Sequence, residues 1–209
     1  MDLNEKQLQI INTAEQLFAD KGFEGTSVRD IAEVAGINVA MISYYFGSKE
    51  KLLETLFAVR AEGTVQKLEG MLKDKVMNPL QKVNVMIDYY IDKFQQQNCF
   101  YKILMREQVA VQRTVTSELI QHFKKRNQLL VKQLIQEGQK TGEFNKSVDV
   151  PMLMTTLIGT AGHLMATQHM YKEINNLQEM PDEQFQKLLK KKLSTHLKFL
   201  FKVILTHEV

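Results

Sequence analysis

Hydroxyl, amide and cationic side chains gather between residues 26 and 49 of this 209-residue chain. Such groups suit hydrogen bonding to phosphate oxygens and base edges, and apolar side chains among them can contact the thymine methyl group. A lysine beside a helix N-terminus adds positive charge where backbone N–H groups already favour an anion. The side chains expected to contact DNA are those of Thr26, Ser27, Arg29, Asn38, Val39, Ala40, Met41, Ser43, Tyr44, Tyr45 and Lys49.

The spacing of small and apolar residues in this segment predicts a helix-turn-helix. Ala32 allows two helices to approach closely, and Gly36, four residues later, suits a turn that needs positive φ. Ile42, six residues further on, is expected in the small core. Residues 39–41 then lie at the start of the second helix of the motif, which enters the major groove in proteins of this type.

A purely structural interpretation of the same residues stays open. The Tyr44-Tyr45-Phe46 run could close a small core, and we expect Phe46 to be buried. Helix caps such as Ser27 and Asn38 are needed with or without DNA. The charge distribution is also unhelpful, because residues 1–50 carry eight acids and four bases, a net charge of −4, within a chain of +3. DNA binding must therefore depend on individually placed residues rather than on bulk charge.

The elements that would position these residues are helices. Three prolines and ten glycines in 209 residues favour long helices, and no alternation argues for a sheet. Asn4 and Gln7 form a capping-box pattern before the first helix, which stops at Lys21-Gly22. We predict an all-α fold, with a helix-turn-helix domain in 1–48 and an effector-binding and dimerisation domain in 49–209. The later helices are expected near 50–73, 79–97, 100–112, 116–140, 150–172 and 182–206.

The stretch from about Gln9 to Phe57 resembles the TetR family of transcriptional regulators. The marks are Ala-x-x-Leu-Phe from Ala14, Gly-Phe-x-x-Thr-Ser from Gly22, Ile-Ala-x-x-Ala-Gly-Ile from Ile31, and Tyr-Phe-x-Ser-Lys-Glu-x-Leu from Tyr45. The family often has tyrosine where this chain has Ser43. The resemblance implies DNA contacts by Thr26, Arg29, Val39, Ala40, Met41, Tyr44, Tyr45 and Lys49. It also implies a ligand-responsive repressor that binds a near-palindromic operator as a homodimer.

The resemblance implies an effector cavity in the middle helices, although core packing explains the same residues equally well. Methionine and aromatic residues suit an irregular apolar pocket, with Tyr90 and Gln108 as its polar groups. The predicted pocket comprises Met86, Tyr90, Phe94, Phe100, Leu104, Met105, Gln108 and Phe123.

A stripe of small residues in 150–172 predicts close approach of another helix, because each helical glycine costs roughly 1 kcal/mol relative to alanine. A partner subunit is our first choice, and a ligand cavity or an internal neighbour is the alternative. The last helix is amphipathic, with its lysines expected on a solvated face. The predicted dimer interface comprises Thr155, Gly159, Gly162, Ala166, Leu193, Leu197 and Leu200.

Other classes of protein find little support in the sequence. The single cysteine, Cys99, has no histidine nearby in sequence, and we find no phosphate-binding glycine loop and no zinc-ligand spacing. We therefore expect no enzyme activity, cofactor or metal. We find no signal-peptide pattern and no apolar stretch long enough to span a membrane, and we expect a cytoplasmic location. The remaining rival is an architectural or cell-division factor that binds many chromosomal sites and has no effector.

Overall fold

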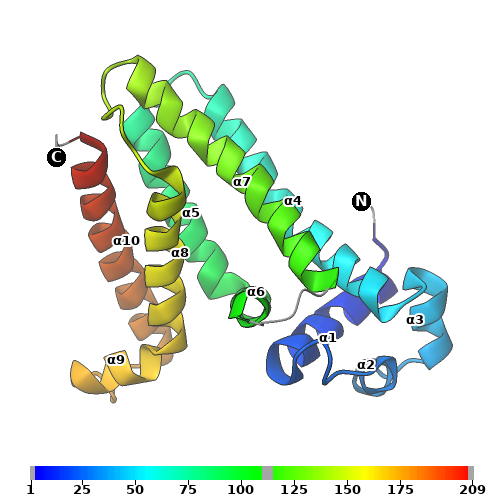
Figure 1. The fold of residues 1–209 in the computed structure, drawn as a ribbon. Coiled ribbons are helices and arrows are strands. Elements are labelled where there is room, and N and C mark those ends of the chain that lie inside the picture. Colours follow the sequence, from blue (N-terminus) through cyan, green and yellow to red (C-terminus); the bar gives the residue numbers. More distant parts are fainter. Residues whose placement is uncertain (1–2, 110–114, 207–209) are drawn as a thin grey trace. The chain divides into compact units, whose positions relative to one another are not determined.

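The computed structural model describes residues 3–109 and 115–206, and every regular element in those ranges is a helix (Figure 1). The all-α prediction is confirmed. No helix in these ranges is long and apolar enough to cross a membrane. The helices are α1 (Glu5–Lys21), α2 (Val28–Ala35), α3 (Val39–Phe46), α4 (Lys49–Lys73), α5 (Pro79–Gln96), α6 (Asn98–Val109), α7 (Val115–Lys140), α8 (Val150–Ala166), α9 (Gln168–Ile174) and α10 (Asp182–Thr206).

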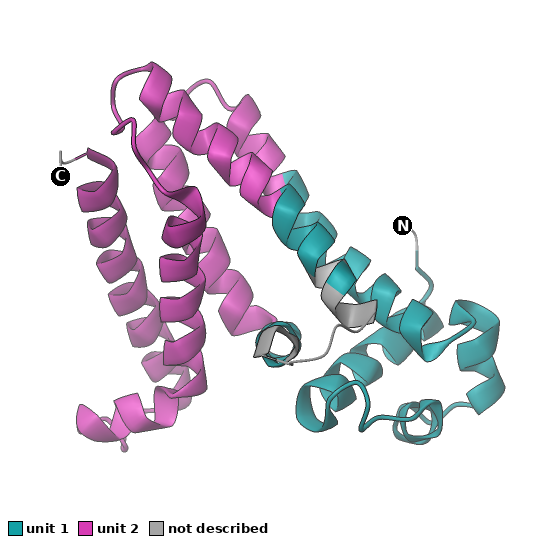
Figure 2. Ribbon diagram, in the orientation of Figure 1, with its two compact units in different colours: residues 1–66, 99–126 teal, residues 67–98, 127–209 magenta. Residues whose placement is uncertain are grey.

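The helices form two compact units, coloured separately in Figure 2. The first unit comprises residues 1–66 and 99–126, and the second comprises residues 67–98 and 127–209. The long helices α4 and α7 each contribute residues to both units. The predicted domain boundary between residues 48 and 49 follows the sequence motif and stays a prediction.

The first unit begins with the predicted capping box of α1. Asn4 Oδ1 accepts from the Gln7 backbone N–H, and Gln7 Oε1 accepts from the Asn4 backbone N–H. Farther along, α1 is tied to α4 by a charged pair. Glu15 is 6% exposed, and its carboxylate accepts from Arg60 Nε at 2.8 Å and Nη2 at 2.6 Å. A buried carboxylate held this way keeps its charge compensated, which fixes α4 on the small N-terminal core.

The second unit is organised along α5, which packs against α8 and α10 (Figure 1). Polar residues line the seam between α5 and α10. Asp88 accepts from the Ser194 hydroxyl at 2.6 Å and from Lys198 Nζ at 2.5 Å, and Asp92 pairs with Lys190. Lys190 and Lys198 are partly exposed to solvent, and in addition they pair with carboxylates of α5.

The helix predicted over 150–172 is interrupted at one residue and forms two helices. The structure ends α8 at Ala166 and starts α9 at Gln168. Thr167 between them has φ −108° and ψ 19°, and its backbone N–H and hydroxyl both donate to the His163 carbonyl. The backbone bond is the usual helical one, and a threonine hydroxyl bonded to the carbonyl four residues earlier often bends a helix. Of the helix predicted over 100–112, residues 110–112 lie outside the described ranges.

Candidate DNA-binding site

The turn between α2 and α3 adopts the predicted geometry. Gly36 has φ 62° and ψ 39°, and its N–H bonds back to the Ala32 and Glu33 carbonyls. A Cβ built on Gly36 would meet no atom within 4 Å, so the left-handed conformation, not space, favours glycine here. Ala32 and Ile42 are buried, as expected of the helix-crossing and core positions. These three predictions are confirmed.

One face of α3 is buried and the other is open. Ile42 and Phe46 face the core, at 1% and 8% exposed, which confirms the prediction for Phe46. Ala40 and Ser43 are exposed, and Val39 and Tyr44 are 40% and 82% exposed. Asn38 Oδ1 caps the helix by accepting from the Ala40 N–H at 2.9 Å. Residues 39, 40, 43 and 44 thus form the outer face of α3, an exposed surface anchored from behind by the core.

The other predicted residues on α3 are less exposed. Met41 and Tyr45 are half-buried. The Tyr45 ring stands edge-on to Tyr44, with centroids 5.0 Å apart, and also contacts Phe46. The Tyr45 ring therefore packs against Tyr44, and part of Tyr45 itself is exposed to solvent.

The start of α2 holds its own carboxylate. The Ser27 backbone N–H and hydroxyl donate to Asp30 Oδ2 at 2.8 and 2.7 Å, and the Asp30 N–H donates to Ser27 Oγ at 3.1 Å. The Ser27 hydroxyl and N–H lower the pKa of the Asp30 carboxyl. The hydroxyl proton of Ser27 is thus already used, although the side chain is exposed. Arg29 is exposed on the first turn of the helix.

Thr26 differs from its predicted role. Its side chain is 1% exposed, and its hydroxyl lies within hydrogen-bonding distance of the carbonyls of Gly22, at 2.8 Å, and Leu17, at 3.2 Å. The hydroxyl is turned into the protein, where it ties the loop before α2 to the end of α1. The structure therefore contradicts the expected phosphate contact by this hydroxyl, because it does not reach the surface.

Lys49 also faces inward in part. Its Nζ donates to the Phe23 and Thr26 carbonyls at 2.9 and 3.0 Å, and lies 4.2 Å from the centroid of the Phe23 ring. An ammonium has three N–H donors, so one is left for a phosphate. Lys49 therefore anchors the loop between α1 and α2, and sequence reasoning missed this because a lysine stem can point either way.

The predicted effector-pocket residues are divided between the two units. Met86, Tyr90 and Phe94 are buried in the second unit, whereas Phe100 and Leu104 are buried in the first. Met105 and Phe123 are half-buried in the first unit, and the side chain of Gln108 lies outside what the structure describes. A single pocket made of these residues stays a prediction. Asn127, which accepts a hydrogen bond from Tyr90, was not among the candidates.

The predicted dimer interface is partly corrected by burial. Leu193 and Leu197 are 2% and 0% exposed within one protomer, so they pack in its core and cannot contact a partner as predicted. Leu200 is half-buried. On the same helix, sequence reasoning missed Phe199, which is 65% exposed. Both faces of α10 carry apolar residues, so the pattern alone did not separate them.

The small residues of α8 do lie at the surface. Thr155, Gly159 and Ala166 are exposed and Gly162 is half-buried. A Cβ on Gly159 would meet no atom within 4 Å, so nothing inside the protomer requires glycine there. A groove of about 1110 Å³ runs between α8 and α10 at this point. Its lining includes Gly159, Thr160, His163, His196 and Phe199.

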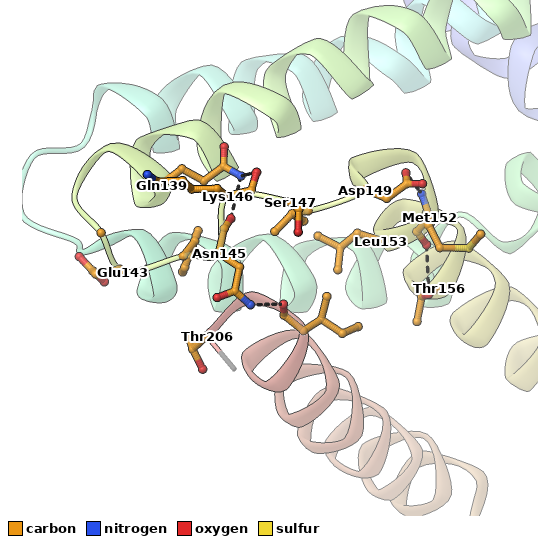
Figure 3. A pocket seen from close by; sticks show the side chains of 14 residues that line it. Gln139, Glu143, Asn145, Lys146, Ser147, Asp149, Met152, Leu153, Thr156 and Thr206 are labelled. Carbon is orange, nitrogen blue, oxygen red and sulfur yellow. Dashed lines mark hydrogen bonds between the residues drawn. The ribbon is translucent and has the colours of Figure 1, made fainter. Parts of the chain in front are cut away.

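A second hollow, of about 970 Å³, lies where the α7–α8 loop meets the ends of α8 and α10 (Figure 3). Its polar groups largely hold the loop together. Gln139 Nε2 donates to the carbonyls of Asn145 and Lys146 at 2.8 and 3.0 Å, and Asn145 Nδ2 donates to the Ile204 carbonyl at 3.2 Å. Asp149 caps α8 through the Met152 N–H. These hydrogen bonds fix the loop that forms part of the wall of the hollow.

The described residues offer little for catalysis. They contain no group of three or more His, Cys, Asp or Glu side chains placed to hold a metal ion. Cys99 Sγ donates to Gln16 Oε1 at 3.2 Å, and burial, with the charge of Glu15, raises the pKa of the thiol. A thiol held in its protonated form is a poor nucleophile.

Comparison with known proteins gives matches over most of the chain. Residues 10–56 match the family model described as "Bacterial regulatory proteins, tetR family", and residues 79–193 match "Tetracyclin repressor-like, C-terminal domain". The probable HTH-type transcriptional regulator YttP of Bacillus subtilis is 32% identical over 136 residues, which cover 65% of this chain and 66% of that protein. The HTH-type transcriptional repressor KstR2 of Rhodococcus jostii is 28% identical, over 75% of this chain and 76% of its own.

A solved structure supports the fold over a longer range. The transcriptional regulator FadR from Bacillus subtilis, in complex with stearoyl-CoA, superposes with a TM-score of 0.67 at 21% identity. The superposition covers 91% of this chain and 96% of that one. The likeness extends through both units, beyond the N-terminal segment that carries the sequence motifs.

Proposed function

We propose that this chain, which belongs to the tetR family of bacterial regulatory proteins, is a ligand-responsive repressor that binds a near-palindromic operator as a homodimer. Members of the family are regulators of transcription and not enzymes. DNA binding and a role in transcription regulation follow from membership. The homodimer, the repressor role and release by a small molecule are the proposed part.

The outer face of α3 is the observation that carries the proposal. Val39 and Tyr44, at 40% and 82% exposed, place a large apolar and a large amphipathic side chain on the side of α3 away from the core. With Ala40 and Ser43 they form a narrow ridge on a capped helix, which suits insertion into a major groove. Arg29 and the free donor of Lys49 would contact phosphates beside it.

The surface of α8 and α10 supports a homodimer. Gly159 leaves open space on α8, and Phe199 stands out from α10 beside it. A two-fold axis would bring the same surface of each protomer together, so that Phe199 of one copy could fill the space beside glycine of the other. Two recognition helices would then contact successive major grooves about 34–36 Å apart.

The effector part of the proposal draws on relatives. KstR2 is named a repressor, and the FadR structure holds stearoyl-CoA. We infer that a small apolar or amphipathic molecule binds the helical domain of this chain and prefers the conformation that does not bind DNA. Such a ligand shifts the population away from the operator, by no more than its difference in affinity for the two states.

Selection of DNA from a random pool tests operator binding. The purified protein should enrich an inverted repeat whose half-sites lie about 10 base pairs apart. Fluorescence anisotropy with the enriched duplex should then show that Tyr44→Ala weakens binding by about tenfold or more. The variant Tyr44→Phe keeps the ring and removes the hydroxyl, so its affinity shows how much of the loss is due to each. Sedimentation should show an unchanged dimer for both variants. Failure to enrich any sequence would overturn the proposed function, and full affinity of Tyr44→Ala would overturn the assignment of the α3 face.

A further inference from the structure

A hydrogen bond between two buried side chains joins α5 to α7 in the second unit. The Tyr90 hydroxyl donates to Asn127 Oδ1 at 2.7 Å, and the two residues are 2% and 5% exposed. Burial raises the pKa of Tyr90 well above its ordinary value of 10.0. The phenol therefore keeps its proton and remains the donor of this pair.

The amide nitrogen of Asn127 takes no part in the hydrogen bond with Tyr90. Nδ2 carries two N–H donors, and neither has an acceptor among the residues that the structure describes. Exchanging the amide oxygen and nitrogen does not solve this, because the Tyr90 proton would then lose its acceptor. Native interiors rarely leave a buried polar group unpaired, and each such group needs an explanation.

The neighbouring positions are apolar. Met86 and Phe94 lie one helical turn before and after Tyr90 on α5, and Val131 lies one turn after Asn127 on α7. All three are buried, at 0%, 2% and 0% exposed. Two amide donors beside these three apolar side chains are the arrangement by which a pocket orients a ligand with few polar groups.

We propose that Asn127, held in place by Tyr90, is the polar anchor of the effector site, and that the effector carries a carbonyl or carboxylate oxygen on an apolar body. The oxygen accepts from Asn127 Nδ2, and the apolar body packs against α5 and α7. This inference rests on the proposed function, since it concerns the ligand to which the regulator responds. Tyr90 is a positioning residue, because its only donor is used on Asn127.

A first test needs no ligand. If Asn127 has unpaired donors in the free protein, replacing both polar partners by apolar groups of similar shape removes an unfavourable burial. The double variant Tyr90→Phe/Asn127→Leu should therefore unfold at the same or a higher urea concentration than Gln128→Leu, a control at the exposed neighbouring position of α7. Tyr90→Phe alone should unfold earlier. A clearly lower midpoint for the double variant would show a satisfied structural pair and overturn the proposal.

The second test uses two probes, 2-nonanone for a neutral carbonyl and nonanoate for a carboxylate. At least one should raise the melting temperature of the wild-type protein, and which one does so identifies the kind of oxygen. Titration calorimetry should give about tenfold weaker binding of that probe to Asn127→Leu, a change of about 1.4 kcal/mol. Binding to Gln128→Leu should match the wild type.

The outcomes separate this inference from the proposed function. Equal binding of the probe to wild type and Asn127→Leu overturns the inference, as does the absence of any shift with both probes, which would leave water as the partner of the amide. In either case sequence-specific DNA binding by the same preparation would leave the proposed operator recognition intact. Loss of DNA selection, by contrast, would count against the proposed function whatever the probes do.

Discussion

Replacing Lys49 by methionine should destabilise the first unit. The substitution keeps the length of the side chain but removes two hydrogen bonds from Nζ, to the Phe23 and Thr26 carbonyls, and the cation above the Phe23 ring. Hydrogen bonds from a charged donor contribute about 1.5–3 kcal/mol each, and the cation–π contact about 0.5–1 kcal/mol. Lys49 is only half-buried, so water can replace part of these interactions when they are lost. We therefore expect the free energy of unfolding to fall by about 2 kcal/mol.

Urea unfolding followed by circular dichroism measures this loss, and Lys51→Met is the matched control. Lys51 is two residues away on α4, and its ammonium pairs with Glu54 at the surface, a contact worth about 0.5 kcal/mol or less. DNA binding provides the second measurement. Losing a phosphate contact lowers the slope of log K against log salt by about 0.9, whereas losing a loop anchor weakens binding at every salt concentration with little change of slope.

Two results together would refute this reasoning. One is a free energy of unfolding for Lys49→Met within 0.5 kcal/mol of that for Lys51→Met, a difference of the size expected for surface substitutions. The other is a loss of DNA affinity that a reduced salt slope alone accounts for. Lys49 would then contact a phosphate without anchoring the loop before α2.

Two further predictions concern the dimer face and the start of α2. Phe199→Asp should weaken dimerisation by about 30-fold or more, as expected for an aromatic anchor worth at least 2 kcal/mol. The control Val76→Asp, at a 94% exposed site, should leave dimerisation unchanged. If both variants sediment alike, α10 is not part of the dimer interface. Because hydrogen bonds from Ser27 lower the pKa of Asp30 in the folded state, its contribution to stability is present above its ordinary value of 3.8 and is lost as the pH falls through the lowered value. As the pH falls below 3.8, the free energy of unfolding of Asp30→Asn should therefore decline less than that of the wild type. Equal declines of the two proteins in acid unfolding would argue against a stabilising cap at Asp30.

The sequence predicted features whose cause is local. The caps at Asn4 and Asn38 and the turn at Gly36 depend on residues within four positions of one another, so their patterns were readable. The direction of a long side chain is different. Lys49 and Thr26 carry groups suited to phosphate, and only the packing of α1 against the following loop turns them inward.

Features that depend on distant contacts were missed. Leu197 and Phe199 are both apolar and two residues apart, so either could face a partner until α5 and α8 bury one of them. Asn127 meets Tyr90 across 37 positions of sequence. One signal could have found it: a lone amide at helical spacing from Phe123 and Val131 interrupts an apolar stripe.

The seam between α5 and α10 limits how the second unit can rearrange. Asp88 and Asp92 are one turn apart on α5, and Lys190, Ser194 and Lys198 repeat at the same interval on α10. Sliding α10 by a fraction of a turn would break these contacts together, whereas a full turn of about 5.4 Å could re-form some of them with shifted partners. This pair of helices therefore has discrete registers, separated by one helical turn. If a ligand displaces helices gradually, as the proposed function requires, the displacement occurs elsewhere in the unit.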